Sequence, residues 1–160
     1  MKRGSTTFLK IALFLIGIPI LALCIFVLPL IMKDAGEGSA EMAYVLYGIL
    51  TIMYVSAIPF YFALYQAFIL LSYIDKNKAF SDISVKALKK IKNCATTISI
   101  LFVAGMPLFY IVGEVDDAPG VIVIGMVIIF ASMVISVFAA VLQRLLQEAI
   151  HIKSENDLTI

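Results

Sequence analysis

Charged side chains are scarce in this chain. Asp, Glu, Lys and Arg make up 14% of its 160 residues, whereas soluble globular proteins carry about 25%. A soluble protein of this size would have to spread polar groups over a large surface, and 23 charged residues are too few for that. Apolar residues reach 62%, and the mean hydropathy is +1.07. The composition therefore excludes most soluble enzymes, nucleic-acid-binding proteins and disordered segments, and it predicts a membrane protein.

The chain also lacks the residues of common catalytic and metal sites. Its one histidine, His151, has no Cys or His companion. Of the two cysteines, Cys24 falls inside an apolar run and Cys94 at the edge of another, so we expect neither a disulfide nor a metal site. No nucleophile–base pair, phosphate-binding loop or zinc-protease motif occurs. We therefore expect no catalytic residue, no cofactor and no enzyme activity.

Four long runs without a charged residue lie between the charge clusters. They cover 11–32, 42–74, 93–113 and 118–143, which is 22, 33, 21 and 26 residues. A helix needs about 20 apolar residues to cross the hydrocarbon core, and it satisfies its own backbone hydrogen bonds there. We predict an all-α, four-transmembrane-helix bundle in one membrane domain over 1–160, with spans near 11–32, 42–70, 94–113 and 118–143. Pro59 is a candidate bend in the long second span.

The basic residues indicate the orientation. Eleven of the twelve Lys and Arg residues precede the first run, separate the second from the third, or follow the fourth. Only Lys33 lies in the other two loops. Loops rich in Lys and Arg stay in the cytoplasm. We therefore expect both termini, the loop at 75–92 and the tail at 144–160 in the cytoplasm, and a multi-pass protein of the cell membrane.

No ionisable residue lies well inside a run; Lys10 and Arg144 lie at edges, where their ammonium and guanidinium groups can snorkel. Pumps and ion-coupled carriers usually keep a charged residue within the membrane, despite the cost of desolvating it. Small four-helix multidrug exporters depend on such a carboxylate, so that class is disfavoured. Transport or permeability for a small molecule, alone or as a subunit, is kept as the alternative function.

Hydroxyl groups follow one face of the second run. Together with Ser72 they lie within about 80° on a helical wheel. This polar stripe, a candidate lining for a groove or for an amphipathic ligand, consists of Tyr47, Thr51, Tyr54, Tyr61 and Tyr65. We favour the alternative that the hydroxyls bond to neighbouring helices, as polar groups do between membrane spans.

Small residues recur in the fourth run. Ser132, Ser136 and Ala140 follow one another at intervals of four and form a small-residue face. Such faces let helices approach closely. The spacing leaves open whether the contact lies within one chain or in a homo-oligomer.

A basic segment precedes the third run. Ser84 is a candidate helix cap there. Val85 and Leu88 share an apolar face, with lysines elsewhere around the helix, which is typical of a helix lying on anionic lipid. Docking to an acidic protein is the alternative.

A faint internal repeat suggests tandem duplication of a helical hairpin. Leu13-Phe14-x-x-Gly17-x-Pro19 recurs as Leu101-Phe102-x-x-Gly105-x-Pro107, and Ser81–Val85 is similar to Asn156–Ile160. Chance similarity among Leu- and Ile-rich segments is the alternative. The second similarity leads to the hypothesis that loop and tail form one cytoplasmic surface. Its candidate partner residues are Ser81, Asp82, Lys86, Lys89, Lys90, Asn156, Asp157, Leu158, Thr159 and Ile160.

Three segments resemble a known family. They are Ala79-Phe80-Ser81, Val85-Lys86-x-Leu88-Lys89-Lys90-Ile91 and the ending Lys153-Ser154-Glu155-Asn156-Asp157-Leu158-Thr159-Ile160. Over essentially its whole length the chain resembles the YoaS-like proteins, small bacterial tetraspan membrane proteins classed as a domain of unknown function. The resemblance implies a four-helix membrane domain without an established activity, cofactor or catalytic residue. It also implies a cytoplasmic partner, because genes of the family are often found beside a small helix-turn-helix regulator.

These observations favour a non-enzymatic membrane protein that engages a cytoplasmic regulator through its loop and tail. The expected partners are the lipid bilayer, that regulator and, if the small-residue face is intermolecular, a second copy. We expect no direct contact with nucleic acid. An enzyme acting on lipid is the least favoured class.

Overall fold

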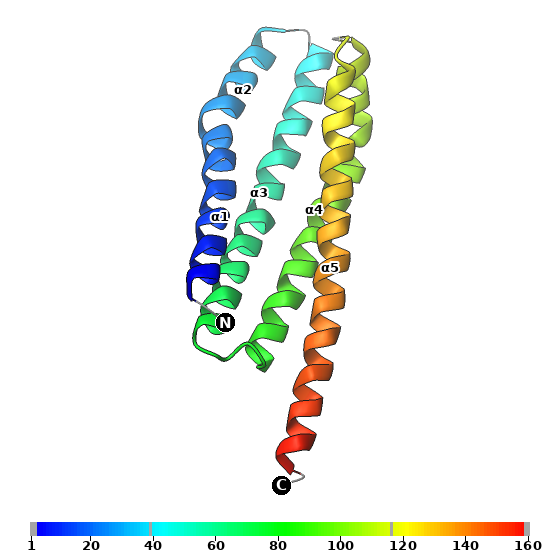
Figure 1. Ribbon diagram of the computed structural model, residues 1–160. Helices are drawn as coiled ribbons and strands as arrows, with labels where there is room; N and C mark the ends of the chain where they lie inside the picture. The colour runs from blue at the N-terminus through cyan, green and yellow to red at the C-terminus, as the bar shows by residue number, and fades with distance from the viewer. Residues whose placement is uncertain (1–2, 39, 116, 159–160) are drawn as a thin grey trace.

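The computed structural model describes residues 3–38, 40–115 and 117–158, and nearly all of them are helical (Figure 1). In chain order the elements are α1 (Arg3–Ala22), the π-helix η1 (Leu23–Val27), α2 (Leu28–Glu37), α3 (Ala40–Asp75), α4 (Asp82–Val115) and α5 (Pro119–Leu158). No strand occurs in these residues. The all-α prediction is confirmed.

Four helices in the described part of the chain are long and apolar enough to cross a membrane. The first covers Gly4–Lys33 and combines α1, η1 and the start of α2, while α3, α4 and α5 are the others. Each predicted span falls in one of these helices. α5 is the longest, with 40 residues and a length of about 60 Å.

The helices extend further than the charge pattern indicated. α3 has 36 residues and passes through Pro59 without ending. The loop between α3 and α4 is only 76–81, because residues 82–92 form the first turns of α4. The helical part of the chain therefore includes most of the segment expected as a loop.

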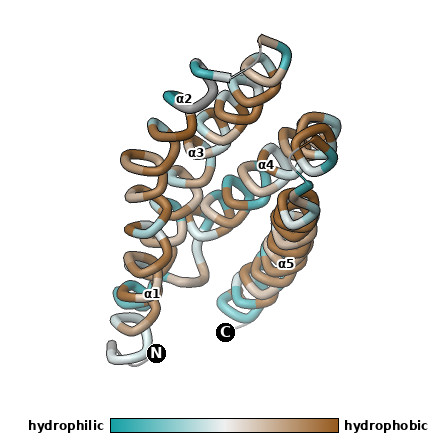
Figure 2. The backbone as a smooth tube through the Cα atoms, turned by 90° about the horizontal axis from the view of Figure 1, so that it is seen from above, coloured by the Kyte–Doolittle hydropathy of each residue, from teal (hydrophilic) through white to brown (hydrophobic). Residues whose placement is uncertain are grey.

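The four helices pack in the order of the sequence. α3 lies between the first helix and α4, and α4 lies between α3 and α5 (Figures 1 and 2). Among the described residues, extensive contacts between spans join only such neighbours. The bundle is an open row, with α1 at one edge and α5 at the other.

Aromatic and aliphatic side chains fill the seam between α3 and α4. Ile49 of α3 packs with Phe102 and Phe109 of α4, whose rings stack with centroids 5.9 Å apart. A Cβ atom at Gly105 would lie 2.5 Å from Ile52 Cδ1. Glycine at this position therefore lets the two helices approach closely.

Small side chains line the face that α5 turns to α4. The buried residues of α5 follow one another at intervals of seven and are Gly125, Ser132 and Ala139. The Ser136 hydroxyl oxygen lies 2.7 Å from Thr96 Oγ1 of α4. The predicted small-residue face thus takes part in a contact within one chain, although its third member, Ala140, is only half-buried.

Backbone hydrogen bonds end α3 at a defined residue. Asn77 adopts a left-handed conformation with φ 57°, and the N–H of Lys78 donates to the Tyr73 carbonyl at 2.8 Å. This arrangement is a Schellman motif, in which asparagine can replace glycine. α4 ends in the same way, with Asp117 at φ 50°.

Ser81 caps the start of α4. Its hydroxyl oxygen accepts the N–H of Ser84 at 3.4 Å, and its carbonyl accepts the N–H of Val85 at 3.3 Å. The prediction that Ser84 is the cap is therefore wrong by one turn. Ser84 itself is buried.

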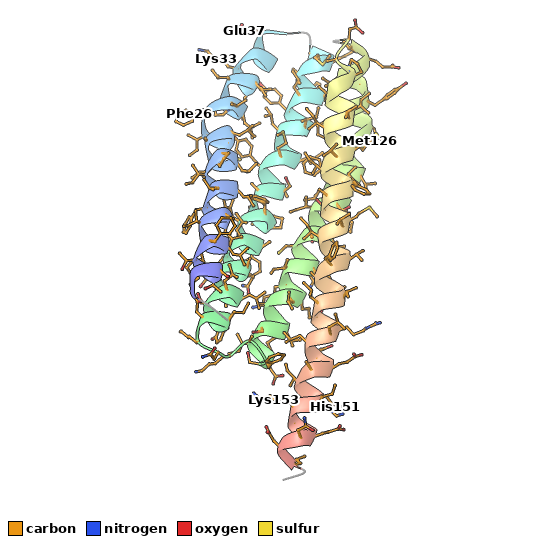
Figure 3. The ribbon with its side chains drawn as sticks, in the orientation of Figure 1. Phe26, Lys33, Glu37, Met126, His151 and Lys153 are labelled. Atoms are coloured by element: carbon orange, nitrogen blue, oxygen red, sulfur yellow. The ribbon has the colours of Figure 1, made fainter. Side chains whose placement is uncertain are left out.

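Many large apolar side chains of the helices are exposed, and hydrophobic residues make up much of each helix (Figure 2). Phe26 and Met126 point away from the row at opposite edges (Figure 3). One end of the row carries the start of α1, the loop 76–81 and the projecting end of α5, and we call it the basic end (Figure 1). The opposite, acidic end carries Glu37 and Asp117.

Candidate functional site

The polar stripe of α3 divides into residues that reach the first helix and residues that do not. Tyr54 and Tyr61 donate hydrogen bonds to that helix. Thr51 bonds instead to the Tyr47 carbonyl, one turn back in α3, at 2.8 Å. Tyr47 and Tyr65 are exposed. The structure therefore joins two of the five stripe residues to a neighbouring helix.

Tyr54 supplies a donor that the first helix lacks. In η1 the N–H of Leu28 donates to the Leu23 carbonyl, so it is not available to the carbonyl of Cys24. The next donor in this register would be Pro29, which has no N–H. The Tyr54 hydroxyl donates to the Cys24 carbonyl at 2.9 Å. An unpaired carbonyl is costly in hydrocarbon, so this hydroxyl stabilises the wide turn.

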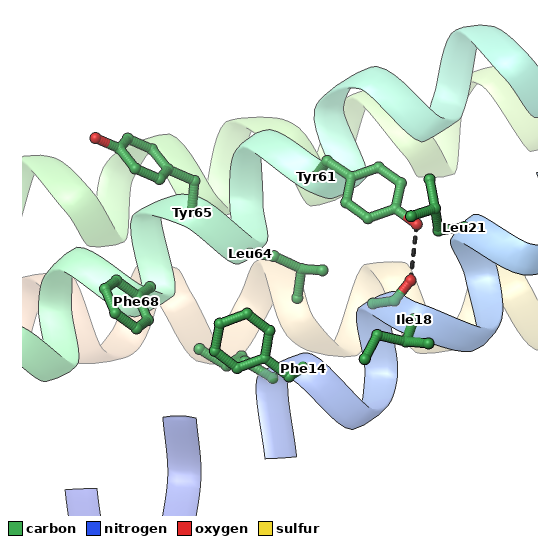
Figure 4. A pocket seen from close by; sticks show the side chains of 9 residues that line it. Phe14, Ile18, Leu21, Tyr61, Leu64, Tyr65 and Phe68 are labelled. Atoms are coloured by element: carbon green, nitrogen blue, oxygen red, sulfur yellow. Dashed lines mark hydrogen bonds between the residues drawn. The ribbon is translucent and has the colours of Figure 1, made fainter. Parts of the chain in front are cut away.

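Tyr61 makes a similar bond two turns along α3. Its hydroxyl donates to the Gly17 carbonyl at 2.8 Å (Figure 4). A Cβ atom at position 17 would lie 3.2 Å from Leu64 Cδ1, so glycine permits the close approach of α1. In the regular α1 helix this carbonyl also accepts from its own chain, so the Tyr61 bond is an additional one.

A third polar contact joins α1 and α3 at the basic end. Lys10 Nζ lies 2.8 Å from Asp75 Oδ2, and the Thr6 hydroxyl donates to the other carboxylate oxygen. The ammonium group of Lys10 also lies 5.2 Å from the centroid of the Phe68 ring, in the range of a cation–π interaction. Lys10 therefore pairs within the protein, whereas its position predicted only a snorkelling side chain.

The three contacts follow a seven-residue spacing on both helices. Along α3 the series is Tyr54, Tyr61, Phe68 and Asp75, and along the first helix it is Lys10, Gly17 and Cys24. Seven residues are close to two helical turns, so each series stays on one face. We call these contacts the α1–α3 ladder. The sequence analysis did not predict the Asp75 contact, although the seven-residue spacing of Tyr54, Tyr61, Phe68 and Asp75 could have indicated it.

The first turns of α4 carry half of the candidate partner surface. Asp82 and the three candidate lysines, Lys86, Lys89 and Lys90, are exposed, and Ser81 is half-buried. Val85 and Leu88 are buried within the protein. The segment is therefore the continuous start of α4, and Val85 and Leu88, which were expected to face lipid, pack within the protein instead.

The end of α5 carries the other half. Asn156, Asp157 and Leu158 are exposed on a helix that continues beyond the other spans (Figure 1). Thr159 and Ile160 lie outside the described residues. The tail is thus helical up to Leu158, and its side chains have defined directions.

A depression at the basic end brings loop and tail together. Phe80 of the loop and four residues of α5, namely Ala149, Ile152, Lys153 and Asn156, line a volume of about 380 Å³. His151 and Lys153 mark this part of α5 in Figure 3. Phe80 and Ile152 were not among the predicted site residues, although Phe80 lies next to Ser81 in the loop and Ile152 lies three residues after Ala149 on the helical tail.

The titratable residues of the tail form one further contact. His151 Nε2 lies 3.1 Å from Glu155 Oε1, one turn along α5, and both side chains are mostly exposed. No group of three or more His, Cys, Asp or Glu side chains with metal-site geometry occurs among the described residues.

Comparison with known proteins assigns the chain to a family. The model of the family described as "Protein of unknown function (DUF2975)" matches residues 30–160. The chain belongs to this family. A relative in Bacillus subtilis (strain 168), called "Uncharacterized membrane protein YoaS", is 69% identical over 160 residues, which are 100% of both chains. The resemblance to YoaS-like proteins is confirmed. No solved structure matches the chain.

The family match separates two parts of the molecule. The DUF2975 region begins at residue 30, in α2, and contains α3, α4 and α5. Both α1 and η1, which form the first-helix side of the ladder, precede it. The chain is therefore a membrane protein of a family whose function is unknown.

Proposed function

We propose that this DUF2975 protein is a non-enzymatic, single-domain protein of the cell membrane that binds a cytoplasmic protein at its basic end. The distribution of Lys and Arg supports an orientation with this end in the cytoplasm. Both termini then lie on the cytoplasmic side. The observation that carries the proposal is the depression between loop and tail.

The depression has the properties of a docking site for a protein side chain. Phe80 and Ile152 are both largely exposed and provide apolar contact area. Lys153 and Asn156 supply a cation and an amide at the rim. A partner segment with an apolar anchor beside an acidic residue complements this pattern.

The surrounding elements hold the depression in place before a partner binds. The Schellman motif at Asn77 and the cap at Ser81 fix both ends of the loop. The tail is already helical, so binding does not have to order it, which lowers the entropic cost of association. The family resemblance implies a helix-turn-helix regulator as the candidate partner.

A photocrosslinking experiment tests the proposal. A photoreactive residue replacing Lys153 should crosslink one cytoplasmic protein in intact cells, and one replacing Phe138, on the exposed face of the α5 span, should not. The captured protein, purified, should bind the intact chain in detergent. Phe80→Ala should weaken this binding at least tenfold, because it removes the aromatic side chain that lines the depression. Equal binding by the intact chain, by Phe80→Ala and by a chain lacking Glu155–Ile160 would contradict the proposal.

Cysteine labelling tests the orientation separately. After replacement of Cys24 and Cys94, Gly38→Cys should react with an impermeant maleimide in intact cells. Ser81→Cys should react only after the cells are opened. The opposite pattern would place the basic end outside.

The transport alternative lacks a supporting cavity in the described residues. The groove between α1 and α3 lies at the level of the spans, and its lining is almost entirely apolar. A pathway for a polar solute needs polar groups along it. Protein binding is therefore the function that the geometry supports best.

A further inference from the structure

An apolar groove runs between α1 and α3 on the outer surface of the row. Its volume is about 400 Å³, within the size range of small-molecule sites. The residues that line it are Leu13, Phe14, Gly17, Ile18 and Leu21 of α1, and Tyr61, Leu64, Tyr65 and Phe68 of α3 (Figure 4). Gly17 makes the groove deeper, because it has no side chain to fill it.

The two ends of the groove differ in polarity. Toward the acidic end, the bond from Tyr61 to the Gly17 carbonyl joins the two helices. Toward the basic end, Phe68 lines the groove, and the ammonium group of Lys10 lies over its ring. A ligand that follows the groove therefore meets hydrocarbon over its length and charged groups at one end.

We propose that the groove binds one acyl chain of an anionic phospholipid from the leaflet at the basic end. In the orientation proposed above, this is the cytoplasmic leaflet. A lipid chain extends from a charged headgroup at the interface into the hydrocarbon core, which is the polarity of the groove. Lys10 lies over Phe68 at this end of the groove, and Lys76 and Lys78 follow Asp75 closely in the chain, so an anionic headgroup is complementary to this end.

Lys10 can contact the headgroup without leaving Asp75. An ammonium group has three N–H donors, and the contact with Asp75 Oδ2 uses one of them. About a quarter of the Lys10 side chain is exposed. Its remaining donors can therefore reach a phosphate oxygen beside the Phe68 ring.

The absence of tryptophan from the chain makes the groove accessible to fluorescence. Tyr65→Trp places a single reporter in the groove, and Phe138→Trp places one on the exposed face of α5. Each variant is reconstituted in phosphatidylcholine vesicles that contain a minor share of brominated phosphatidylglycerol or brominated phosphatidylcholine. Bromine on the acyl chain quenches a neighbouring tryptophan. The ratio of the two quenching constants at one position gives the lipid preference and removes the effect of depth.

The groove reporter should favour phosphatidylglycerol about fivefold, since one lysine near the surface contributes about 1 kcal/mol toward anionic lipid. The α5 reporter should show a ratio near one. Lys10→Gln should reduce the groove ratio toward one. Asp75→Asn, which breaks the same ion pair but keeps the ammonium group, should leave the ratio unchanged or raise it. A purely structural role of the pair predicts equal losses in both variants.

Filling the groove tests the acyl-chain contact itself. Gly17→Leu should lower quenching of the groove reporter by both lipids, and Gly120→Leu, which adds the same bulk where no atom lies within 4 Å, should not. If Gly17→Leu does not fold, Leu64→Phe fills the groove from the opposite wall. Equal lipid ratios at the two reporters would show that the lipid at the groove is ordinary boundary lipid, and they would overturn the proposal. Protection of the groove reporter from both lipids in a dimer would assign the groove to a second copy and would also overturn it.

Discussion

The seam between α1 and α3 and the seam between α4 and α5 join antiparallel helices in different ways. Between α4 and α5, small residues at 125, 132 and 139 let the helices approach closely, and the hydroxyl contact between Ser136 and Thr96 is added to this packing. Between α1 and α3, polar groups connect the helices at three levels, and an apolar groove lies alongside them. Close packing and hydrogen bonding are thus two separate means of holding helices together in lipid, where helix association gains little from the hydrophobic effect.

The repeated motif shows how context changes the role of a residue. Phe14 and Phe102 occupy the same place in the repeat, yet Phe14 is 60% exposed and Phe102 only 5%. Phe102 faces α3 in the middle of the row, whereas Phe14 belongs to the helix at its edge. If the two hairpins arose by duplication, the central position of α4 now gives its copy of the motif a packing role.

Overpacking the α4–α5 seam should have the largest effect. Ser132→Leu inserts bulk into a buried small-residue face and should lower the free energy of unfolding by about 1–3 kcal/mol. Titration of the detergent-solubilised protein with SDS, followed by circular dichroism, measures this change. Met133→Leu, on the adjacent exposed position, is the control and should leave the midpoint unchanged. Equal midpoints for the two variants would show that the seam does not depend on small residues.

Removing one hydroxyl should weaken the α1–α3 seam less. Tyr54→Phe leaves the Cys24 carbonyl without a donor and should cost about 1 kcal/mol. Tyr61→Phe should cost less, because the Gly17 carbonyl keeps its helical donor. Tyr65→Phe, at an exposed position, should have no effect on the SDS midpoint. A different ranking of the three variants would contradict the account of η1.

Restoring the missing backbone donor should suppress the Tyr54 effect. An alanine at position 29 has the N–H that Pro29 lacks, and this N–H can serve the Cys24 carbonyl. The cost of Tyr54→Phe should therefore fall by about half or more in a Pro29→Ala background, as a double-mutant cycle. Tyr61→Phe in the same background is the control and should keep its full cost. If the free-energy costs of Tyr54→Phe and Pro29→Ala are additive, the Tyr54 hydroxyl does not compensate for the N–H that Pro29 lacks.

Breaking the ion pair at the basic end should have the smallest effect. Asp75→Asn should lower the free energy of unfolding by at most about 0.5 kcal/mol, because the pair is partly exposed to water. Added salt should shrink the difference further, since it screens such pairs. A large, salt-independent loss would show that the pair is the main contact of the seam.

The sequence predicted the spans well because hydrocarbon imposes one strong requirement, a long run without charge. Two of the stripe residues, Tyr54 and Tyr61, bond to the neighbouring helix, as the favoured interpretation of the stripe expected. The sequence did not reveal η1, because a π-helix depends on which backbone N–H donors are missing locally. The sequence contains Pro29, but it does not show that the Cys24 carbonyl is the acceptor left without a donor. Ser81 was missed as the cap of α4 because Ser84, three residues later, has the same capping side chain.

The tertiary contacts of the basic end were harder to predict. Asp75 follows the last apolar residue of its run and has the sequence context of a loop. Its carboxylate is held in place by Thr6 and Lys10, which are more than 60 residues away in the chain. The orientation of the protein, by contrast, rests on the distribution of lysines and is a prediction from the sequence alone.

The row arrangement has a consequence for synthesis of the protein. Each span packs on the one that precedes it in the chain, so a newly inserted helix needs to find only its immediate predecessor. Native contacts between neighbours along the chain favour fast folding, and domains generally fold from the N-terminus during translation. The first helix is inserted before α3 and packs on it once α3 has entered the membrane. The tightly packed α4–α5 hairpin forms last. Assembly can therefore proceed stepwise at the pace of the ribosome, without a closing step that brings the first and last spans together.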